Sequence, residues 1–166
     1  FRIAAHLTCV GADRGQVDAV ARRWWEVGVR RIVALRGDVP GGGAWRPHPN
    51  GYARAAELVA GLTRIAPFNI AVAAYPEVHP DSPSPEADID NLKRKQDAGA
   101  AVAITQYCFD NEPILRLRDR AAAAGVTIPI VPGVLPVTNF AKVVSFSRKC
   151  GASVPAWLAE EFEGLD

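Results

Sequence analysis

EVGVRRIVAL, residues Glu26–Leu35, joins the end of a helical pattern to a glycine and then to an apolar run. The same order returns in DAGAAVAIT (Asp97–Thr105) and in AAGVTIPIV (Ala123–Val131). Glycine directly after a helix is typical of the left-handed backbone that ends helices, and the apolar run is typical of a buried strand. The chain therefore repeats a helix–strand unit rather than a sequence, which indicates an α/β protein.

Five apolar runs are expected to form strands, because they are rich in Val, Ile, Ala and Leu and do not alternate strictly with polar residues. They are Ile3–Val10, Arg31–Leu35, Phe68–Tyr75, Ala101–Tyr107 and Ile128–Val134. The expected helices are Arg14–Val27, Tyr52–Ile65, Pro85–Ala98, Pro113–Ala124, Asn139–Lys149 and Ala156–Glu163. Four of them are followed by a glycine that can end the helix: Gly28, Gly99, Gly125 and Gly151. No linker divides the chain, so residues 1–166 are expected to form a single domain.

The composition is that of an ordinary soluble globular protein, with 166 residues, of which 49% are apolar and 22% charged. A net charge of +1 gives no electrostatic reason to expect nucleic acid or an anionic membrane as a partner. No apolar run approaches the roughly 20 residues of a membrane helix. The cysteines, Cys9, Cys108 and Cys150, match neither a disulfide framework nor a zinc-ligand spacing. We therefore expect reduced thiols in a cytoplasmic protein.

Polar and ionisable residues gather at the carboxyl end of each early strand. They are His6 and Thr8, Arg36 and Asp38, Tyr75, Glu77 and His79, and Thr105 and Gln106. An open doubly wound sheet concentrates its ligand groups at one switch point, whereas a (β/α)8 TIM barrel surrounds its site with all of its βα loops. The pattern favours the barrel type. Since such a barrel takes about 200 residues or more, we expect a partial barrel of about five parallel βα units.

The motif Leu35-Arg36-Gly37-Asp38 closes the second strand. Gly37 would let a planar ligand approach the backbone, and Asp38 would place a carboxylate at the mouth of the site. The alternative is a strand-end turn with a surface Arg–Asp pair. Integrin binding through the RGD tripeptide is disfavoured, because the motif follows a buried strand.

The motif Tyr75-Pro76-Glu77-Val78-His79-Pro80 closes the third strand, and its two prolines stiffen the turn. A planar ligand can stack on Tyr75 and form a hydrogen bond with His79. The alternative is a rigid proline-rich loop with an exposed histidine. No metal site is expected, because the histidines are not at metal-ligand spacing.

Asp88, Asn91 and Lys95 stand at helical spacing, so they share one face of the following helix, with Arg94 beside them. These residues can bind a ribityl chain or a diphosphate; the alternative is a solvated helix face. Gln106 ends the fourth strand, where an amide can pair with the amide edge of a heterocycle or simply cap a turn. The Gly41–Gly43 run lacks the residues of a phosphate-binding loop.

Six motifs in this order and spacing resemble 5,10-methylenetetrahydrofolate reductase of the bacterial type. They are HLTC (His6–Cys9), LRGD (Leu35–Asp38), AAYPEVHP (Ala73–Pro80), NLKRKQDAGA (Asn91–Ala100), AITQ (Ala103–Gln106) and PGVLPVTNF (Pro132–Phe140). The resemblance implies a (β/α)8 barrel with non-covalent FAD. It also implies that NADH or NADPH reduces the flavin, which then passes a hydride to 5,10-methylenetetrahydrofolate in a ping-pong reaction. The product is 5-methyltetrahydrofolate.

The resemblance also implies roles for individual residues. The flavin contacts would be His6, Arg36, Gly37 and Asp38, with Tyr52 and Ala53 in the same shell. Tyr75 and His79 would lie along the cofactor, and Asp88, Asn91, Arg94 and Lys95 would hold its ribityl and phosphate parts. Asp38 would be the catalytic carboxylate, which tunes the flavin and contacts the pterin. Gln106 would bind the pterin, and Phe146 would pack on the folate and on the nicotinamide.

The family's general-acid glutamate belongs to a strand upstream of this chain, so the resemblance implies that the first two barrel strands and the last one are missing. A second hypothesis is therefore a non-catalytic flavin- or folate-binding fragment that needs a partner or the missing segments for activity. A third is a structural domain that keeps the barrel sequence. An open arc of strands leaves edges exposed, so we also expect a partner such as another copy of the chain.

Overall fold

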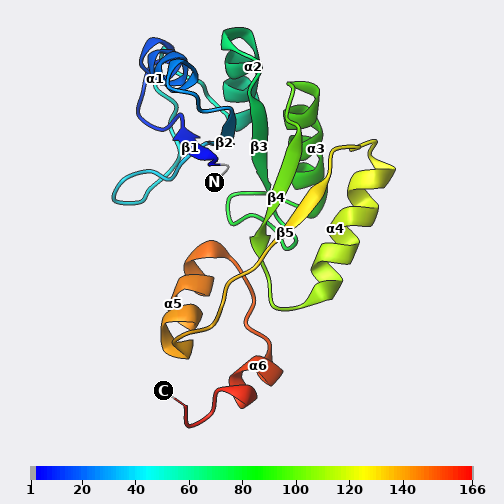
Figure 1. Ribbon diagram of the computed structural model, residues 1–166. Helices are drawn as coiled ribbons and strands as arrows, with labels where there is room; N and C mark the ends of the chain where they lie inside the picture. Colours follow the sequence, from blue (N-terminus) through cyan, green and yellow to red (C-terminus); the bar gives the residue numbers. More distant parts are fainter. Residues whose placement is uncertain (1–2, 166) are drawn as a thin grey trace. The chain divides into compact units, whose positions relative to one another are not determined.

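The computed structural model describes residues 3–165 and alternates strands with helices along the chain (Figure 1). Its strands are β1 (Ala5–Thr8), β2 (Arg31–Leu35), β3 (Asn69–Ala74), β4 (Val102–Tyr107) and β5 (Ile130–Gly133). Its helices are α1 (Arg14–Glu26), α2 (Ala55–Ile65), α3 (Pro85–Asp97), α4 (Asn111–Ala123), α5 (Phe140–Cys150) and α6 (Ala156–Glu161). Each expected strand and helix is confirmed, with boundaries that move by a few residues.

The strands described within residues 3–165 form one sheet in the order β1-β2-β3-β4-β5. β1 pairs with β2 in parallel, with Thr8 opposite Leu35, and β2 pairs with β3 in parallel, with Ala34 opposite Val72. The order follows the chain without reversal, as in a (β/α)8 barrel, whereas a doubly wound sheet reverses its order at a switch point. The expected partial barrel of five parallel βα units is confirmed.

The described residues fall into two compact units. The N-terminal unit comprises residues 3–73 and 94–103, and the C-terminal unit comprises residues 74–93 and 104–165. The chain passes from one unit to the other within β3, within α3 and within β4, so neighbouring residues of one element belong to different units.

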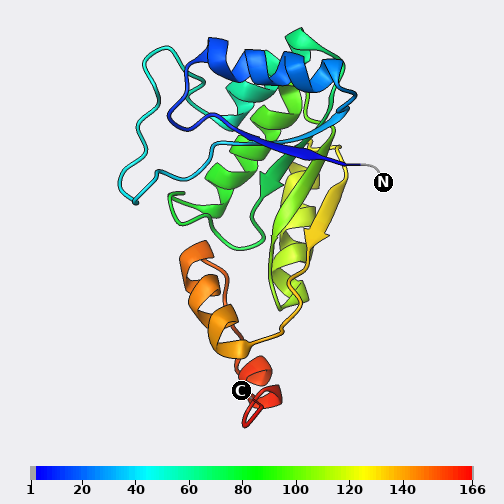
Figure 2. The ribbon, with the colours of Figure 1, turned by 60° about the vertical axis from the view of Figure 1, so that its left-hand side comes forward.

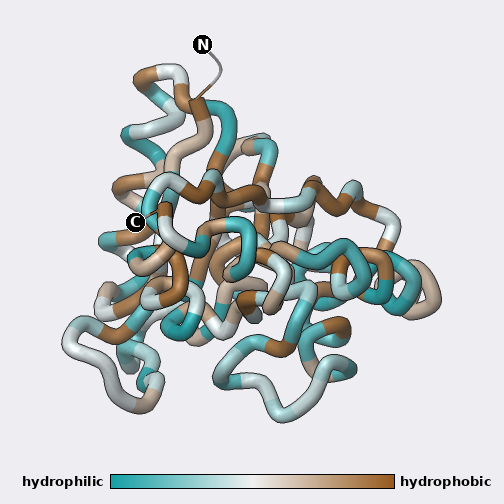
Figure 3. The backbone as a smooth tube through the Cα atoms, turned by 90° about the horizontal axis from the view of Figure 1, so that it is seen from below, coloured by the Kyte–Doolittle hydropathy of each residue, from teal (hydrophilic) through white to brown (hydrophobic). Residues whose placement is uncertain are grey.

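The core of the N-terminal unit lies between α2 and the strands. Ile32, Leu58, Leu62, Ile70 and Val72 are completely buried. α2 packs against both α1 and β2, and Figures 1 and 2 show α1 and α2 side by side. Figure 3 shows hydrophobic and hydrophilic stretches alternating along the chain, as expected where amphipathic helices pack on strands.

Helix ends follow local hydrogen bonds. Asp13 caps α1 by accepting from the Gln16 N–H at 2.8 Å, and the Gln16 side chain accepts from the Asp13 N–H at 3.1 Å. α4 begins at Asn111, before the expected Pro113, because the Asp110 carboxylate accepts from the Glu112 N–H. The glycines expected to end helices all have positive φ: Gly28, Gly99, Gly125 and Gly151.

α2 begins at Ala55 rather than at the expected Tyr52. The Tyr52 side chain is 2% exposed, and its hydroxyl donates to Asp18 of α1 at 2.7 Å. The ring lies against Gly61, where a Cβ atom would meet the Tyr52 hydroxyl. Tyr52 is therefore held as a buried loop residue between α1 and α2.

The core of the C-terminal unit includes Leu92 of α3, Leu117 of α4 and Val143 of α5. Tyr107, at the end of β4, shares a buried hydrogen bond of 2.9 Å with Ser147 of α5. This bond ties α5 to β4. Within residues 3–165, no helix has the length and apolar character needed to cross a membrane.

Candidate functional site

The carboxyl ends of β1 and β2 are joined directly in the N-terminal unit. The Cys9 N–H donates to the Leu35 carbonyl at 3.3 Å, and the Cys9 thiol lies 3.5 Å from the Arg36 carbonyl. Gly37 has φ of 84°, and a Cβ atom there would lie 2.7 Å from Cγ1 of Val10. Glycine is therefore required because the chain crosses its own β1 segment, a reason that is independent of any ligand.

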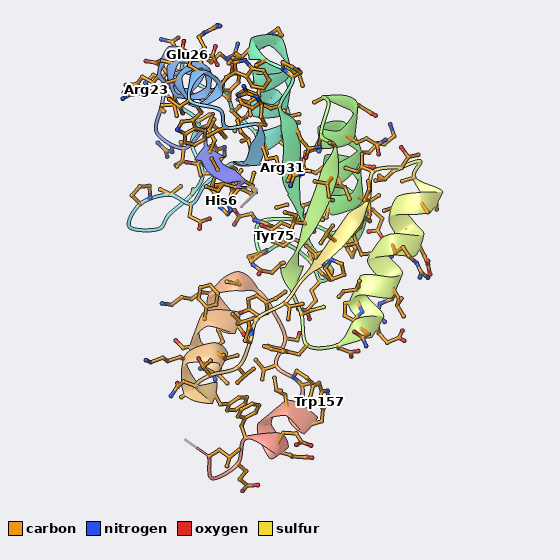
Figure 4. All side chains as sticks on the ribbon, in the orientation of Figure 1. His6, Arg23, Glu26, Arg31, Tyr75 and Trp157 are labelled. Atoms are coloured by element: carbon orange, nitrogen blue, oxygen red, sulfur yellow. The ribbon has the colours of Figure 1, made fainter. Side chains whose placement is uncertain are left out.

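Arg36 and Asp38 leave β2 in different environments. Arg36 is half-buried, its Nε donates to the Gly37 carbonyl at 3.4 Å, and its guanidinium carbon lies 5.2 Å from the centre of the Trp45 ring. Asp38 is exposed. His6, labelled on β1 in Figure 4, is exposed on the face opposite to buried Leu7. Arg36 and Asp38 thus offer a cation and a carboxylate just after β2, whereas His6 lies within β1, in register with Val33 rather than at the expected carboxyl end.

Trp45 links the beginning and the end of the long loop between β2 and α2. Its ring faces Arg36, and its indole Nε1 donates to the Ala53 carbonyl at 3.1 Å. The Ala53 N–H donates a hydrogen bond to the Glu57 carboxylate at 3.2 Å. Sequence reasoning missed Trp45. The available signal was a large aromatic residue inside a loop of glycine and proline.

The predicted flavin-shell residue Tyr52 has its side chain occupied by Asp18. Burial, followed by the hydrogen bond to Asp18, raises the pKa of Tyr52 to about 12. A ligand next to this segment would therefore meet the backbone of Tyr52 and Ala53 rather than the phenol. Burial likewise raises the pKa of the Cys9 thiol, so this cysteine is not an activated nucleophile.

Lys95 reaches the carboxyl end of β3 from α3. Its side chain is 5% exposed, and its ammonium donates to the Ala73 carbonyl at 2.9 Å. Arg94, the next residue back, is exposed. Because the Lys95 ammonium is buried, this face of α3 is not fully solvated, which was the alternative expected from the sequence. The bond to the Ala73 carbonyl offsets part of the cost of burying the cation.

In the C-terminal unit, His79 is oriented by three neighbours. Its ring meets Tyr75 edge to face, with 4.5 Å between centroids and 83° between planes. Its Nδ1 accepts from the Asp81 N–H at 2.9 Å, which leaves Nε2 to carry the proton in the neutral imidazole. Its backbone N–H donates to the Asp88 carboxylate at 2.9 Å. Asp88 therefore fixes the loop, and Tyr75 and the Asp81 amide fix the ring.

Tyr75, labelled in Figure 4, also borders a cavity of about 300 Å³ in the same unit. Asn91 is half-buried on α3. The cavity is lined by Tyr75, Pro76, Glu77, Val78, Pro85, Ile89, Pro113, Arg116, Leu117 and Arg120. Its wall combines apolar side chains with the Glu77 carboxylate and two guanidinium groups.

Gln106 and Phe146 each contact Tyr107 in the C-terminal unit, Gln106 at its backbone and Phe146 at its ring. The Gln106 side-chain oxygen accepts from the Tyr107 N–H at 3.0 Å, which leaves its amide NH2 as the donor end. Phe146 stacks on Tyr107 with 6.1 Å between centroids and is 51% exposed. Phe146 also lines a hollow of about 190 Å³ formed with Leu135, Pro136, Thr138, Asn139, Lys142 and Val143. An exposed aromatic beside a hollow is a suitable surface for a planar ligand.

No group of three or more His, Cys, Asp or Glu side chains within the described part of the chain is arranged to hold a metal ion. The half-buried Cys108 donates to the Asp110 carbonyl, and burial, with the nearby Glu77 charge, raises the pKa of its thiol. The described cysteines are free thiols: Cys9, Cys108 and Cys150.

The family model for methylenetetrahydrofolate reductase matches residues 1–166. The chain belongs to the methylenetetrahydrofolate reductase family. The resemblance seen in the sequence motifs is thereby confirmed.

Named methylenetetrahydrofolate reductases align along nearly all of this chain. The 5,10-methylenetetrahydrofolate reductases of Salmonella typhimurium and Escherichia coli are each 50% identical over 163 residues, which is 98% of this chain and 53% of the relative. Methylenetetrahydrofolate reductase 2 of Saccharomyces cerevisiae is 33% identical over 165 residues, 96% of this chain and 28% of the relative. The chain thus spans about half the length of the bacterial methylenetetrahydrofolate reductases that it matches.

Among solved structures, a crystal structure of a Burkholderia cenocepacia lyase/mutase aligns with 99% of this chain and 70% of its own. The TM-score is 0.49 and the sequence identity is 20%.

The residues that the methylenetetrahydrofolate reductase resemblance selects fall into two groups, one in each unit. His6, Arg36, Gly37, Asp38, Tyr52, Ala53, Arg94 and Lys95 belong to the N-terminal unit. Tyr75, His79, Asp88, Asn91, Gln106 and Phe146 belong to the C-terminal unit. Within each group, the strand ends bring together residues that are far apart in the sequence.

Proposed function

We propose that this chain provides the flavin-binding part of an FAD-dependent methylenetetrahydrofolate reductase. In this proposal, NADH or NADPH is the electron donor, 5,10-methylenetetrahydrofolate is the acceptor and 5-methyltetrahydrofolate is the product, with the two substrates bound in turn. The observation that carries the proposal is the family match over residues 1–166, together with polar side chains at the carboxyl ends of successive parallel strands.

Each unit, taken by itself, carries groups that a flavin nucleotide can use. In the N-terminal unit, the guanidinium of Arg36 lies just after β2, where it can contact the flavin. The buried ammonium of Lys95 reaches from α3 to the end of β3, where a cation favours a phosphate. In the C-terminal unit, the Tyr75 and His79 rings offer an aromatic surface. FAD, when bound, supplies the ring that accepts a hydride from the nicotinamide and donates it to the folate.

We assign the remaining roles by what each side chain can offer a ligand. Asp38 is an exposed carboxylate next to the β2 end, where it can influence the flavin and contact the pterin. Gln106 can donate its amide NH2 to the pterin, because its side-chain oxygen is already bound. Phe146 offers an exposed ring for the folate and for the nicotinamide.

The test begins with the visible spectrum of the purified chain mixed with FAD and separated from unbound cofactor. Absorption bands near about 370 and 450 nm that co-elute with the protein would support flavin binding. Anaerobic addition of NADH or NADPH should then bleach the longer-wavelength band, and 5,10-methylenetetrahydrofolate should restore it. A protein that remains colourless after incubation with excess FAD contradicts the proposal.

A non-catalytic flavin- or folate-binding role for the isolated chain is the second candidate. The observation that favours it is that the chain spans about half the length of the bacterial relatives. Flavin bands that co-elute with the chain, without reoxidation by the folate, would select this candidate. Multiple-turnover folate reduction by the chain alone would exclude it.

A further inference from the structure

We propose that Trp45 is a positioning residue for the flavin site, which it serves by holding Arg36 and the Ala53 carbonyl in place. This inference rests on the proposed function, because it concerns the same site. It assigns a role to a residue that no sequence motif singles out.

Trp45 makes two directional contacts with different ends of one loop. Its ring lies 5.2 Å from the Arg36 guanidinium carbon, within the range of a cation–π interaction. Its Nε1–H donates to the Ala53 carbonyl at 3.1 Å. A single side chain therefore joins the residue after β2 to the residues that precede α2.

The surroundings of Trp45 indicate that these contacts anchor the loop. Its neighbours Ala44 and Arg46 are exposed, as are Gly41–Gly43, while Trp45 itself is half-buried. The later part of the loop has its own local bonds, with the Gly51 N–H on the His48 carbonyl at 2.8 Å. Trp45 is thus the point at which the middle of the loop attaches to the strand end.

The consequence for ligand binding follows from the two residues that Trp45 holds. A long arginine side chain loses rotamer entropy when it binds an anion, and this loss is smaller when an aromatic ring already fixes the guanidinium. The hydrogen bond from the Trp45 indole to the Ala53 carbonyl fixes the backbone at the other end of the loop, just before α2. Pre-organisation of both sides should strengthen FAD binding without Trp45 itself contacting the cofactor.

The test compares Trp45→Leu, Trp45→Phe and the control Trp157→Leu in the full chain. Trp157, labelled on α6 in Figure 4, is 51% exposed, so its loss controls for the removal of an indole. FAD dissociation constants are measured by flavin fluorescence, and the environment of the bound flavin by visible circular dichroism. Trp45→Leu, which removes both contacts, should weaken FAD binding about tenfold. Trp45→Phe keeps a ring beside Arg36, so it should weaken binding only about threefold, and Trp157→Leu should match the unaltered chain.

The outcomes separate this inference from the proposed function. If the unaltered chain does not bind FAD, the proposed function fails and the role of Trp45 fails with it. If the unaltered chain binds FAD and Trp45→Leu shows the same affinity and the same circular dichroism, only the role of Trp45 is overturned. If Trp45→Leu does not fold, Trp45→Phe decides: unchanged affinity and an unchanged flavin spectrum overturn the role, and a partial loss supports it.

Discussion

At the residue scale, Tyr52 couples stability to pH. Its pKa is raised from 10.0 to about 12 by burial and by the hydrogen bond to Asp18. Below pH 10 the phenol is protonated in both the folded and the unfolded chain, so its contribution to stability is complete. Above the unfolded pKa the unfolded chain releases the proton first, so that contribution is lost as pH rises towards 12.

We therefore expect the free energy of unfolding to fall by about 2 kcal/mol between roughly pH 10 and 12 through this group. Tyr52→Phe removes both the proton and the 2.7 Å bond to Asp18, and it should cost about 1 kcal/mol at neutral pH. Urea unfolding of both proteins across this pH range measures the difference between them. A Tyr52→Phe protein with the same alkaline loss as the unaltered chain would show that Tyr52 is not responsible.

Lys95 gives a second prediction at this scale, because its charge is buried. Lys95→Met keeps much of the side-chain volume and removes the cation, so FAD binding should weaken about tenfold or more. The free energy of unfolding without FAD should change by no more than about 1 kcal/mol, since replacing a buried charge by an apolar group is often neutral. Lys149→Met, at an exposed position, is the matched control. Equal FAD affinities of the two variants would rule out a cofactor role for Lys95.

The residue scale also shows where sequence reasoning reaches its limit. The strand-end residues Arg36 and Asp38 could be predicted, because polar residues after an apolar run must leave the sheet. The sequence pattern predicts Tyr52 in a helix, because its bond to Asp18 joins positions 34 residues apart and leaves no local pattern. Trp45 was missed for the same reason, because its partners Arg36 and Ala53 become neighbours only when the loop closes.

At the element scale, α2 contains a glycine whose role depends on packing. Gly61 is buried inside the helix, where alanine should be better by about 1 kcal/mol on helix propensity alone. The added Cβ would meet the Tyr52 hydroxyl and ring, however, and overpacking typically costs about 1–3 kcal/mol. We therefore expect Gly61→Ala to destabilise the protein by about 1–2 kcal/mol.

A double-mutant cycle tests this explanation. In a Tyr52→Ala background the clash is absent, so Gly61→Ala should become neutral or stabilising in urea unfolding. A loss of the same size in both backgrounds would mean that Gly61 is required for another reason.

The elements themselves could be predicted because their signals are local. Glycines end the helices, and runs rich in branched apolar residues form the strands. The predicted first residues of α2 and α4 are less accurate. α4 begins earlier than expected because the Asp110 carboxylate caps it, and α2 begins later because Tyr52 instead bonds to Asp18 of α1. Capping and tertiary bonds thus decide boundaries that periodicity cannot.

At the scale of the whole molecule, the two outer strands of the described sheet differ in their ability to pair with another chain. β5 contains Pro132, which lacks an N–H group, and proline within a sheet is typical of edge strands that resist further pairing. β1 has no proline, and the nearby Ile3 is 73% exposed. For the chain by itself, we propose contact with a second copy through β1, because apolar exposure lies beside this outer strand of the described sheet.

We therefore expect light scattering after size exclusion to give a mass of at least two chains at micromolar concentration. Ile3→Lys should shift the protein towards the monomer, because a charge beside an edge strand disfavours strand pairing. Val134→Lys, at a position that is 84% exposed after β5, should leave the mass unchanged, since Pro132 already limits pairing there. A monodisperse monomer that unfolds cooperatively would show that β1 needs no partner chain. Equal effects of the two lysine variants would show that general surface charge, rather than the β1 edge, controls association.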